Sequence, residues 1–235
     1  MSQPLVCCIC LTADRQNLTE RAIRCFLAQT YPKCWLLVYD SGATQFELPP
    51  WATEDRSRVV LARAGSMRGA SIGELRNAAL ALTPAADIIA HWDSDDWSAP
   101  ERIATQVQFL DYRYWVTGFQ NALFSDTLRG GQAWEYDATR SGIGKVIGAT
   151  LLYRREAWQQ HPFDPTRHTG EDTEWVKHFQ VLPTQGVVPS PLFVADVHGK
   201  NTSKVYTVFE NHQPAFQPEW RRVPEWDAFC RERIS

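Results

Sequence analysis

Three carboxylates fall within four positions of the chain, shortly after an apolar run. The run Ile88 to Ala90 is typical of a buried strand, and Asp93, Asp95 and Asp96 follow it. Neighbouring like charges repel one another and are costly to desolvate without partners. The Asp-x-Asp spacing can give two oxygen ligands to a divalent ion such as Mg²⁺, which proteins commonly hold with one or two carboxylates and substrate phosphates. The alternative is structural, because Pro100 indicates a helix start and one aspartate could serve the turn before it.

The elements expected before this cluster alternate between strands and helices. In chain order they are strand 4–12, helix 16–29, strand 35–39, strand 58–61, helix 72–82 and strand 87–92. Ser71 and Glu74 have the spacing of a capping box, which marks the start of the second helix. This order is typical of an α/β fold with a mainly parallel sheet flanked by helices. Ligands of such sheets bind beyond the carboxyl ends of the strands, so we expect Thr12, Asp40 and Asp93–Asp96 on one rim.

The second half of the chain is less regular. Its expected elements are helix 98–111, strands within 114–136, strand 145–153, helix 154–160, loop 161–170, helix 171–180 and a strand-like stretch at 187–197. Glu171 and Asp172 begin the last of these helices, where carboxylates suit the N-terminal dipole. The last thirty residues, rich in Trp, Arg and Glu, are expected to form a covering helix or a flap.

The composition is that of an ordinary globular chain of one domain, or one domain with a small appendage. It has 235 residues, of which 44% are hydrophobic and 22% charged. The net charge of −3 gives no basic footprint, so we do not expect a nucleic-acid partner. No stretch reaches the 18 consecutive apolar residues of a transmembrane helix, and the N-terminus lacks the pattern of a signal peptide. We therefore expect a cytoplasmic protein, with peripheral membrane contact left open.

Cys7 and Cys10 form a C-x-x-C pair, which can indicate zinc or redox chemistry. They lie inside the first expected strand, where they would be buried as small hydrophobic side chains. No second pair has the spacing of zinc ligands. We therefore expect reduced, structural thiols.

The ordered set of polar motifs is similar to that of family 2 glycosyltransferases of the GT-A fold. The motifs are Thr12, Gln29-Thr30-Tyr31-Pro32, Asp40-Ser41-Gly42, Arg76-Asn77-Ala78, Asp93-Ser94-Asp95-Asp96, Gly170-Glu171-Asp172 and His198-Gly199-Lys200-Asn201-Thr202-Ser203. The resemblance covers roughly residues 4–205. It implies one GT-A domain over 1–205, with a nucleotide-binding half at 1–97, an acceptor-binding half at 98–205, and a C-terminal extension at 206–235 that packs on or covers it.

The resemblance also implies a reaction. Family members transfer a sugar with inversion from a nucleotide diphosphate sugar, usually a UDP-sugar, to a hydroxyl on a glycan, lipid or protein. Matched residue by residue, the nucleotide-binding positions are Thr12, Arg15, Asp40, Ser41, Arg76 and Asp93. The carboxylate of Asp40 would accept from the uracil N–H, which favours uridine over cytidine. For Arg76 the alternative is a solvated helix arginine.

The metal ligands implied by the resemblance are Asp95, Asp93 and His198. An imidazole in the shell suits Mn²⁺ better than Mg²⁺, and we expect one of these two ions. His198 could instead be a surface loop residue. Three further candidates, whose tasks are not assigned, are Asp96, Asn201 and Ser203.

The chemistry requires a base, because the attacking hydroxyl must lose its proton. Asp172 is the candidate, and a carboxylate acting as general base raises the rate ~10²–10⁴-fold. The alternative is that Asp172 only stabilises a helix N-terminus. Glu171 would orient the acceptor or pair with an arginine. Two other functions stay open. A nucleotidyltransferase would need a Gly-rich basic loop after the first strand, where residues 11–17 offer only Arg15. A non-catalytic sugar-nucleotide or glycan-binding module would have no need of the carboxylates.

Overall fold

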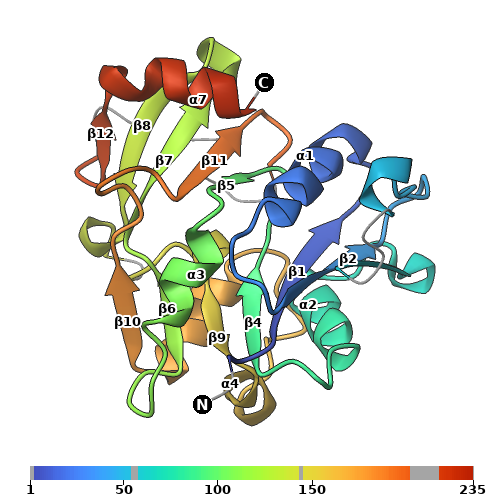
Figure 1. Ribbon diagram of the computed structural model, residues 1–235. Helices are drawn as coiled ribbons and strands as arrows, with labels where there is room; N and C mark the ends of the chain where they lie inside the picture. Colours follow the sequence, from blue (N-terminus) through green and yellow to red (C-terminus); the bar gives the residue numbers. More distant parts are fainter. Residues whose placement is uncertain (1–2, 54–57, 143–144, 202–216, 235) are drawn as a thin grey trace.

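Strand β1 (Val6–Thr12) lies inside a seven-stranded sheet, here called sheet A (Figure 1). The computed structural model describes residues 3–53, 58–142, 145–201 and 217–234. β1 pairs in parallel with β2 (Cys34–Asp40) and β4 (Ile88–His91), and β2 pairs in parallel with β3 (Val59–Arg63). Beyond β4 the sheet continues through β9 (Leu152–Arg154), β6 (Val116–Phe119) and β10 (Val181–Thr184), with β9 antiparallel to both neighbours. The predicted α/β class with a mainly parallel sheet is confirmed.

Helices cover both faces of sheet A, and the side-chain alternation of β1 shows why. Cys8 and Cys10 point to one face, where they meet α1 (Gln16–Leu27) and α3 (Arg102–Val107). Cys7 and Ile9 point to the other face, which is covered by α2 (Ile72–Ala81), α4 (Arg155–Gln160) and α5 (Glu171–Trp175). A strand buried on both faces reads as a continuous apolar run rather than an alternating one. The result is a three-layer α/β/α core.

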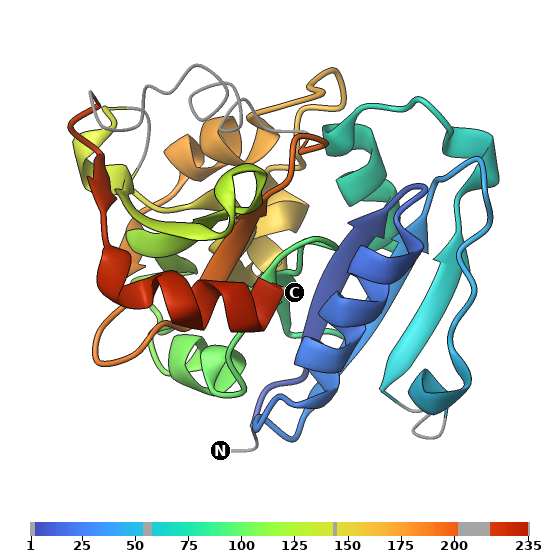
Figure 2. The same cartoon turned by 90° about the horizontal axis from the view of Figure 1, so that it is seen from above.

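A second, five-stranded sheet, sheet B, stands beside the first. Its strands in spatial order are β12 (Trp220–Arg222), β8 (Gln132–Asp137), β7 (Asn121–Asp126), β11 (Phe193–Val197) and β5 (Trp97–Ser98). The C-terminal helix α7 (Asp227–Ile234) covers one face of this sheet, packing Cys230 and Ile234 on the apolar side chains of that face (Figures 1 and 2). The opposite face carries Phe124 and Trp220 and is available to line a site.

Several predicted elements are shorter in the structure than in the sequence patterns. The helix expected at 98–111 runs only over Arg102–Val107, and the one expected at 171–180 ends as an α-helix at Trp175. Of the strand expected at 145–153, only the last two residues lie in a strand, β9 (Leu152–Arg154), and a short 3₁₀-helix over Gly148–Thr150 precedes it. The physical reason is tertiary: Arg102 and Gln106 donate to carbonyls of residues 149–150 and hold that segment out of the ladder. In the described part of the chain no helix has the length and apolar character that crossing a bilayer requires.

All six cysteines lie in the described part of the chain, where they are free and buried. Cys7 and Cys10 face opposite sides of sheet A, so they cannot act as a pair. Burial raises the pKa of the Cys7 thiol well above its ordinary value. Their role in the fold is that of small core residues.

Candidate active site

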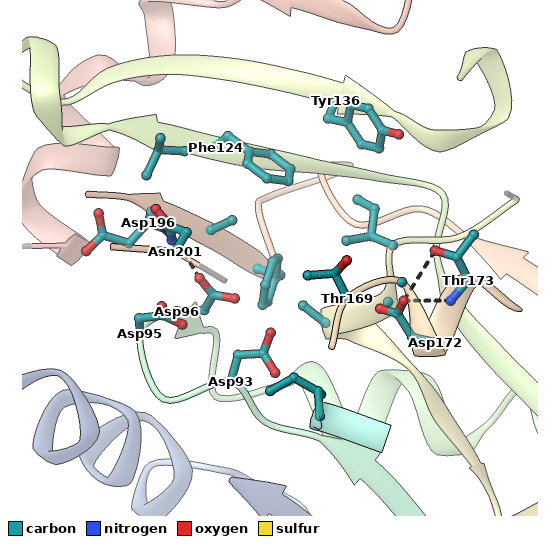
Figure 3. A pocket seen from close by; sticks show the side chains of 18 of the residues that line it. Asp93, Asp95, Asp96, Phe124, Tyr136, Thr169, Asp172, Thr173, Asp196 and Asn201 are labelled. Atoms are coloured by element: carbon teal, nitrogen blue, oxygen red, sulfur yellow. Dashed lines mark hydrogen bonds between the residues drawn. The ribbon is translucent and has the colours of Figure 1, made fainter. Parts of the chain in front are cut away.

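A cavity of about 570 Å³ lies between the carboxyl ends of β1 and β4 and the open face of sheet B. In Figure 3, Asp93 and Asp172 lie on one side of this cavity, and Phe124 and Tyr136 project toward it from the other. Its walls hold a large excess of acidic side chains: the charged residues are Asp93, Asp95, Asp96, Glu171, Asp172, Asp196, Glu219, Arg15 and Arg76. Most of the residues singled out from the sequence therefore meet here.

Asp95 is held by two cationic or proton-bearing neighbours. Its Oδ2 accepts from Arg15 Nη1 at 2.7 Å and from His198 Nε2 at 3.0 Å. Burial opposes ionisation, but the His198 hydrogen bond and the Arg15 charge outweigh it and lower the pKa of Asp95. Arg15 also donates to the carbonyl of Lys200 at 2.6 Å. Arg15, predicted to contact the nucleotide, thus links the aspartate loop to the loop after β11.

Asp96 has a structural task that the sequence did not reveal. Its Oδ1 accepts from the backbone N–H of Asp196 at 3.0 Å, which joins the aspartate loop to β11. Burial, reinforced by the charges of Asp95 and Asp93, raises the pKa of Asp96 well above its ordinary value. Asn201 shapes the same region, because its Nδ2 donates to the carbonyl of Asp196 at 2.6 Å while its Oδ1 accepts from the His198 N–H. Ser203 lies outside the described residues.

Asp93 faces the cavity next to a buried ion pair. Arg76 Nε donates to Glu171 Oε1 at 2.8 Å, and Arg76 Nη2 lies 4.0 Å from Asp93 Oδ1. Burial, opposed by Arg76 and reinforced by Asp95 and Asp172, raises the pKa of Asp93 to about 6. Arg76 is 6% exposed and Glu171 4% exposed, so Arg76 is not a solvated helix arginine. The pair fixes the start of α5 against α2.

Asp172 lines the cavity beside Gly148. Its Oδ1 accepts from the N–H of Thr173 at 2.6 Å, and its Oδ2 lies so close to Gly148 that a Cβ there would sit 1.4 Å from it. The Gly148 carbonyl accepts from His91 Nδ1 at 2.9 Å, which ties the segment to the end of β4. Burial and then the charge of Glu171, opposed by Arg76, raise the pKa of Asp172. A raised pKa makes this carboxylate a stronger base than a solvated one.

Three predicted nucleotide-binding residues do not line the cavity. Thr12 shares a 2.6 Å hydrogen bond with Thr19, and the N–H of Ser41 donates to the carbonyl of Thr12. The carboxylate of Asp40 accepts from two backbone N–H groups of the loop at 41–46, at 2.9 and 2.8 Å. These buried side chains shape the loop after β2, and their contact with a nucleotide base stays a prediction.

Asp95 and His198 are the side chains that could bind a divalent metal ion here. A carboxylate oxygen and an imidazole nitrogen 3.0 Å apart are ligand types that suit Mn²⁺. His198 Nδ1 accepts from the Lys200 N–H at 3.3 Å, so Nε2 carries the proton, which would have to leave Nε2 for ligation. Among the described residues, no three His, Cys, Asp or Glu side chains already converge as a ready-made site. The donor set therefore fits an ion whose shell is completed by substrate phosphates.

Several residues of the site carry no signal of their own in the sequence. They are Asp196, Gly148, Arg21, Arg102, Phe124, Tyr136 and Trp220. Arg21 donates to the carbonyl of Asp95 and, at 2.9 Å, to Asp196 Oδ2. Arg102 donates to the carbonyls of His91 at 2.9 Å and Ala149 at 3.0 Å, which joins the end of β4 to the Gly148 segment. Each of these contacts joins residues distant in sequence, so no local spacing rule could have found them.

The mainly parallel sheet A, flanked by helices and with sheet B beside it, is the GT-A fold that the sequence motifs predicted. The sequence matches no protein-family model and no characterised protein sequence. The chain resembles mannosyltransferase PcManGT from Pyrobaculum calidifontis, solved in complex with GDP-Man and Mn²⁺. The TM-score is 0.64 at 16% identity, over 99% of this chain and 70% of that one.

Two other solved structures have the same fold. TarS 1-349 of S. aureus, in complex with UDP-GlcNAc, matches with a TM-score of 0.65 at 13% identity, over 86% of this chain. GalNAc-T7, solved with UDP, GalNAc and Mn²⁺, matches with a TM-score of 0.60 at 10% identity, over 90% of this chain. The chain spans 61% of the TarS chain and 48% of the GalNAc-T7 chain. At these identities the likeness establishes the fold, and function has to be argued from the site.

Proposed function

We propose that this protein is a metal-dependent glycosyltransferase, which moves a sugar from a nucleotide diphosphate sugar to a hydroxyl acceptor with inversion. The observation that carries the proposal is that Asp93 and Asp95, from the end of β4, share one cavity with Asp172, from the start of α5. Carboxylates beside the donor and a separate carboxylate for the acceptor are what a single displacement requires. Structures of the same fold hold GDP-Man or UDP-GlcNAc, which supports a nucleotide-sugar donor.

The aspartate loop would hold the donor. A divalent ion, Mn²⁺ or Mg²⁺, bound by Asp95, Asp93 and His198 would supply Lewis-acid stabilisation of the leaving diphosphate. Arg15 already contacts Asp95 Oδ2 and would be free to contact a phosphate if it left that oxygen. Arg76, buried beside Asp93, adds a fixed positive charge on the same side of the cavity.

Asp172 would act on the acceptor. Its Oδ2 would take the proton of the attacking hydroxyl as the oxygen forms its bond to the anomeric carbon and the bond from that carbon to phosphate breaks. The raised pKa of Asp172 suits it to this transfer. Because the attack and the departure occur on opposite sides of the carbon, one displacement inverts it. Glu171 is engaged by Arg76 and would act by positioning Asp172.

Donor binding and donor turnover test the proposal. We expect UDP with Mn²⁺ to raise the melting temperature, which corresponds to ~2.7 kcal/mol of stabilisation at a hundredfold excess over the dissociation constant. Hydrolysis of UDP-, GDP- and dTDP-sugars, measured as released nucleotide diphosphate, would identify the donor, with UDP-sugars expected first. If no nucleotide diphosphate shifted the melting temperature and no sugar nucleotide was cleaved, the proposal would be refuted.

A further inference from the structure

The acceptor side of the cavity has an aromatic wall, which consists of Phe124, Tyr136 and Trp220. Trp220 is opposite Tyr136 across the β12–β8 pair, and Phe124 lies diagonally on the neighbouring β7, so all three project from one face of sheet B. Their ring centroids are 4.7 to 5.7 Å apart, in tilted and edge-to-face arrangements. Figure 3 shows Phe124 and Tyr136 directed toward the side of the cavity that holds Asp172.

Charge is distributed unevenly around this wall. Among the described residues that line the cavity, the arginines are Arg15 and Arg76, and each already pairs with a carboxylate, Asp95 or Glu171. Asp172 and Glu219, which border the acceptor side, form no ion pair with any described residue. An anionic group placed here would meet these two carboxylates, and among the described lining residues it would find no arginine without a carboxylate partner, although the imidazole of His168 lines the same cavity.

The faces of the aromatic rings also favour an uncharged ligand over an anionic one. The face of an aromatic ring carries the negative part of its quadrupole, so it attracts C–H groups and cations and disfavours anions. A sugar ring offers an apolar C–H face to such a wall and hydroxyls to polar neighbours. Those neighbours are present, since Ser141, Thr169 and Thr173 line the same cavity.

We propose that the acceptor is an uncharged carbohydrate, bound with its ring against the aromatic wall, and that phosphorylated and carboxylated acceptors are rejected. The inference rests on the proposed function and specifies its second substrate. Two like charges about 6 Å apart, at an effective dielectric constant of about 20, repel enough to weaken binding about 100-fold. A 6-phosphate or a uronate should therefore be used at least about 100-fold less well than the matching neutral glycoside.

The test uses the full chain with UDP and Mg²⁺, which is diamagnetic and so compatible with NMR, and a panel of methyl glycosides, each paired with its 6-phosphate and its uronate. Binding is followed by saturation-transfer NMR, and kcat/KM is measured with the donor that the hydrolysis screen identifies. We expect at least one neutral glycoside to bind and be used, with its charged counterparts about 100-fold weaker. Equal or preferred binding of the charged counterparts, or binding of no neutral glycoside, would overturn the inference. Failure of donor hydrolysis would instead count against the proposed function, while the NMR measurement would still decide the acceptor class.

Two variants assign the effect to the residues. Glu219→Gln should reduce the difference in kcat/KM between neutral and anionic acceptors. Glu225→Gln, at an exposed position, should leave this difference unchanged. Tyr136→Leu should raise KM for the neutral acceptor about tenfold, and should leave the affinity for UDP with Mn²⁺ intact. Tyr112→Leu is its matched control, because Tyr112 is 86% exposed and does not line the cavity. An unchanged gap in Glu219→Gln, or an unchanged KM in Tyr136→Leu, would remove that residue from acceptor selection and overturn the inference.

Discussion

Replacement of Gly148 by alanine should displace the proposed base, Asp172, without changing the Asp172 side chain itself. The added Cβ would lie 1.4 Å from Asp172 Oδ2, whereas ordinary contact begins near 3.4 Å, so the carboxylate must move by about 2 Å. Gly148 has an ordinary φ, and its carbonyl keeps the hydrogen bond from His91, so the backbone has no separate reason to change. A base must lie within ~2.6–3.2 Å of the proton that it takes. We therefore expect kcat to fall ~10²–10⁴-fold, or about 2.7–5.5 kcal/mol of barrier.

The assay compares kcat for sugar transfer with the affinity for UDP and Mn²⁺ in the same variant. Affinity should stay near the wild-type value, since Gly148 acts through Asp172 and not through the aspartate loop. Gly65→Ala is the matched control, because a Cβ at Gly65 has nothing within 4 Å. The double variant Gly148→Ala with Asp172→Asn should be no slower than Asp172→Asn alone. Wild-type turnover in Gly148→Ala would show that Asp172 does not act from the position seen here, and the reasoning would fail.

Three further predictions follow from the site and the ion pairs around it. Asp172→Asn should lower kcat ~10²–10⁴-fold while UDP-sugar binding persists. In the wild type, kcat/KM should fall as the pH falls through the raised pKa of Asp172, because the base must be ionised. The pH–rate profile of Asp172→Asn should lack this fall at low pH. Asp95→Ala should weaken Mn²⁺-dependent UDP binding by at least the roughly 10–100-fold that loss of an outer-shell partner costs, and unchanged Mn²⁺ affinity by calorimetry would reassign the metal site. Arg76→Ala should lower the free energy of unfolding in urea by about 3–5 kcal/mol, because it leaves Glu171 buried without its partner. Arg221→Ala, which removes the exposed partner of Glu135, should lower it by only ~0–1 kcal/mol. Equal losses in the two variants would contradict the burial argument.

The first half of the fold was predictable because its signals are local. The apolar run of β1 and the capping of α2 by Ser71, whose Oγ accepts from the Glu74 N–H at 3.0 Å, depend on residues a few positions apart. The parallel order then places the carboxyl ends of β1 and β4 on one rim, by a general rule of such sheets. Predictions of elements failed where tertiary contacts compete with local preference, as at residues 149–150, whose carbonyls accept from Arg102 and Gln106 and which form a 3₁₀-helix and not a strand.

The sequence by itself determined the class of sheet, the position of the Asp93–Asp96 loop at its rim, and the candidate carboxylates. Only the tertiary structure decided what each of them touches. Asp96 bonds the backbone of Asp196, one hundred positions away, and Asp172 depends on the absence of a side chain at Gly148. The carboxylate of Asp40 accepts from the backbone of its own loop, and its contact with a nucleotide stays a prediction. The reason is physical: spacing along the chain fixes which face of an element a side chain takes, but the partner on that face comes from another element, and only packing brings the two together.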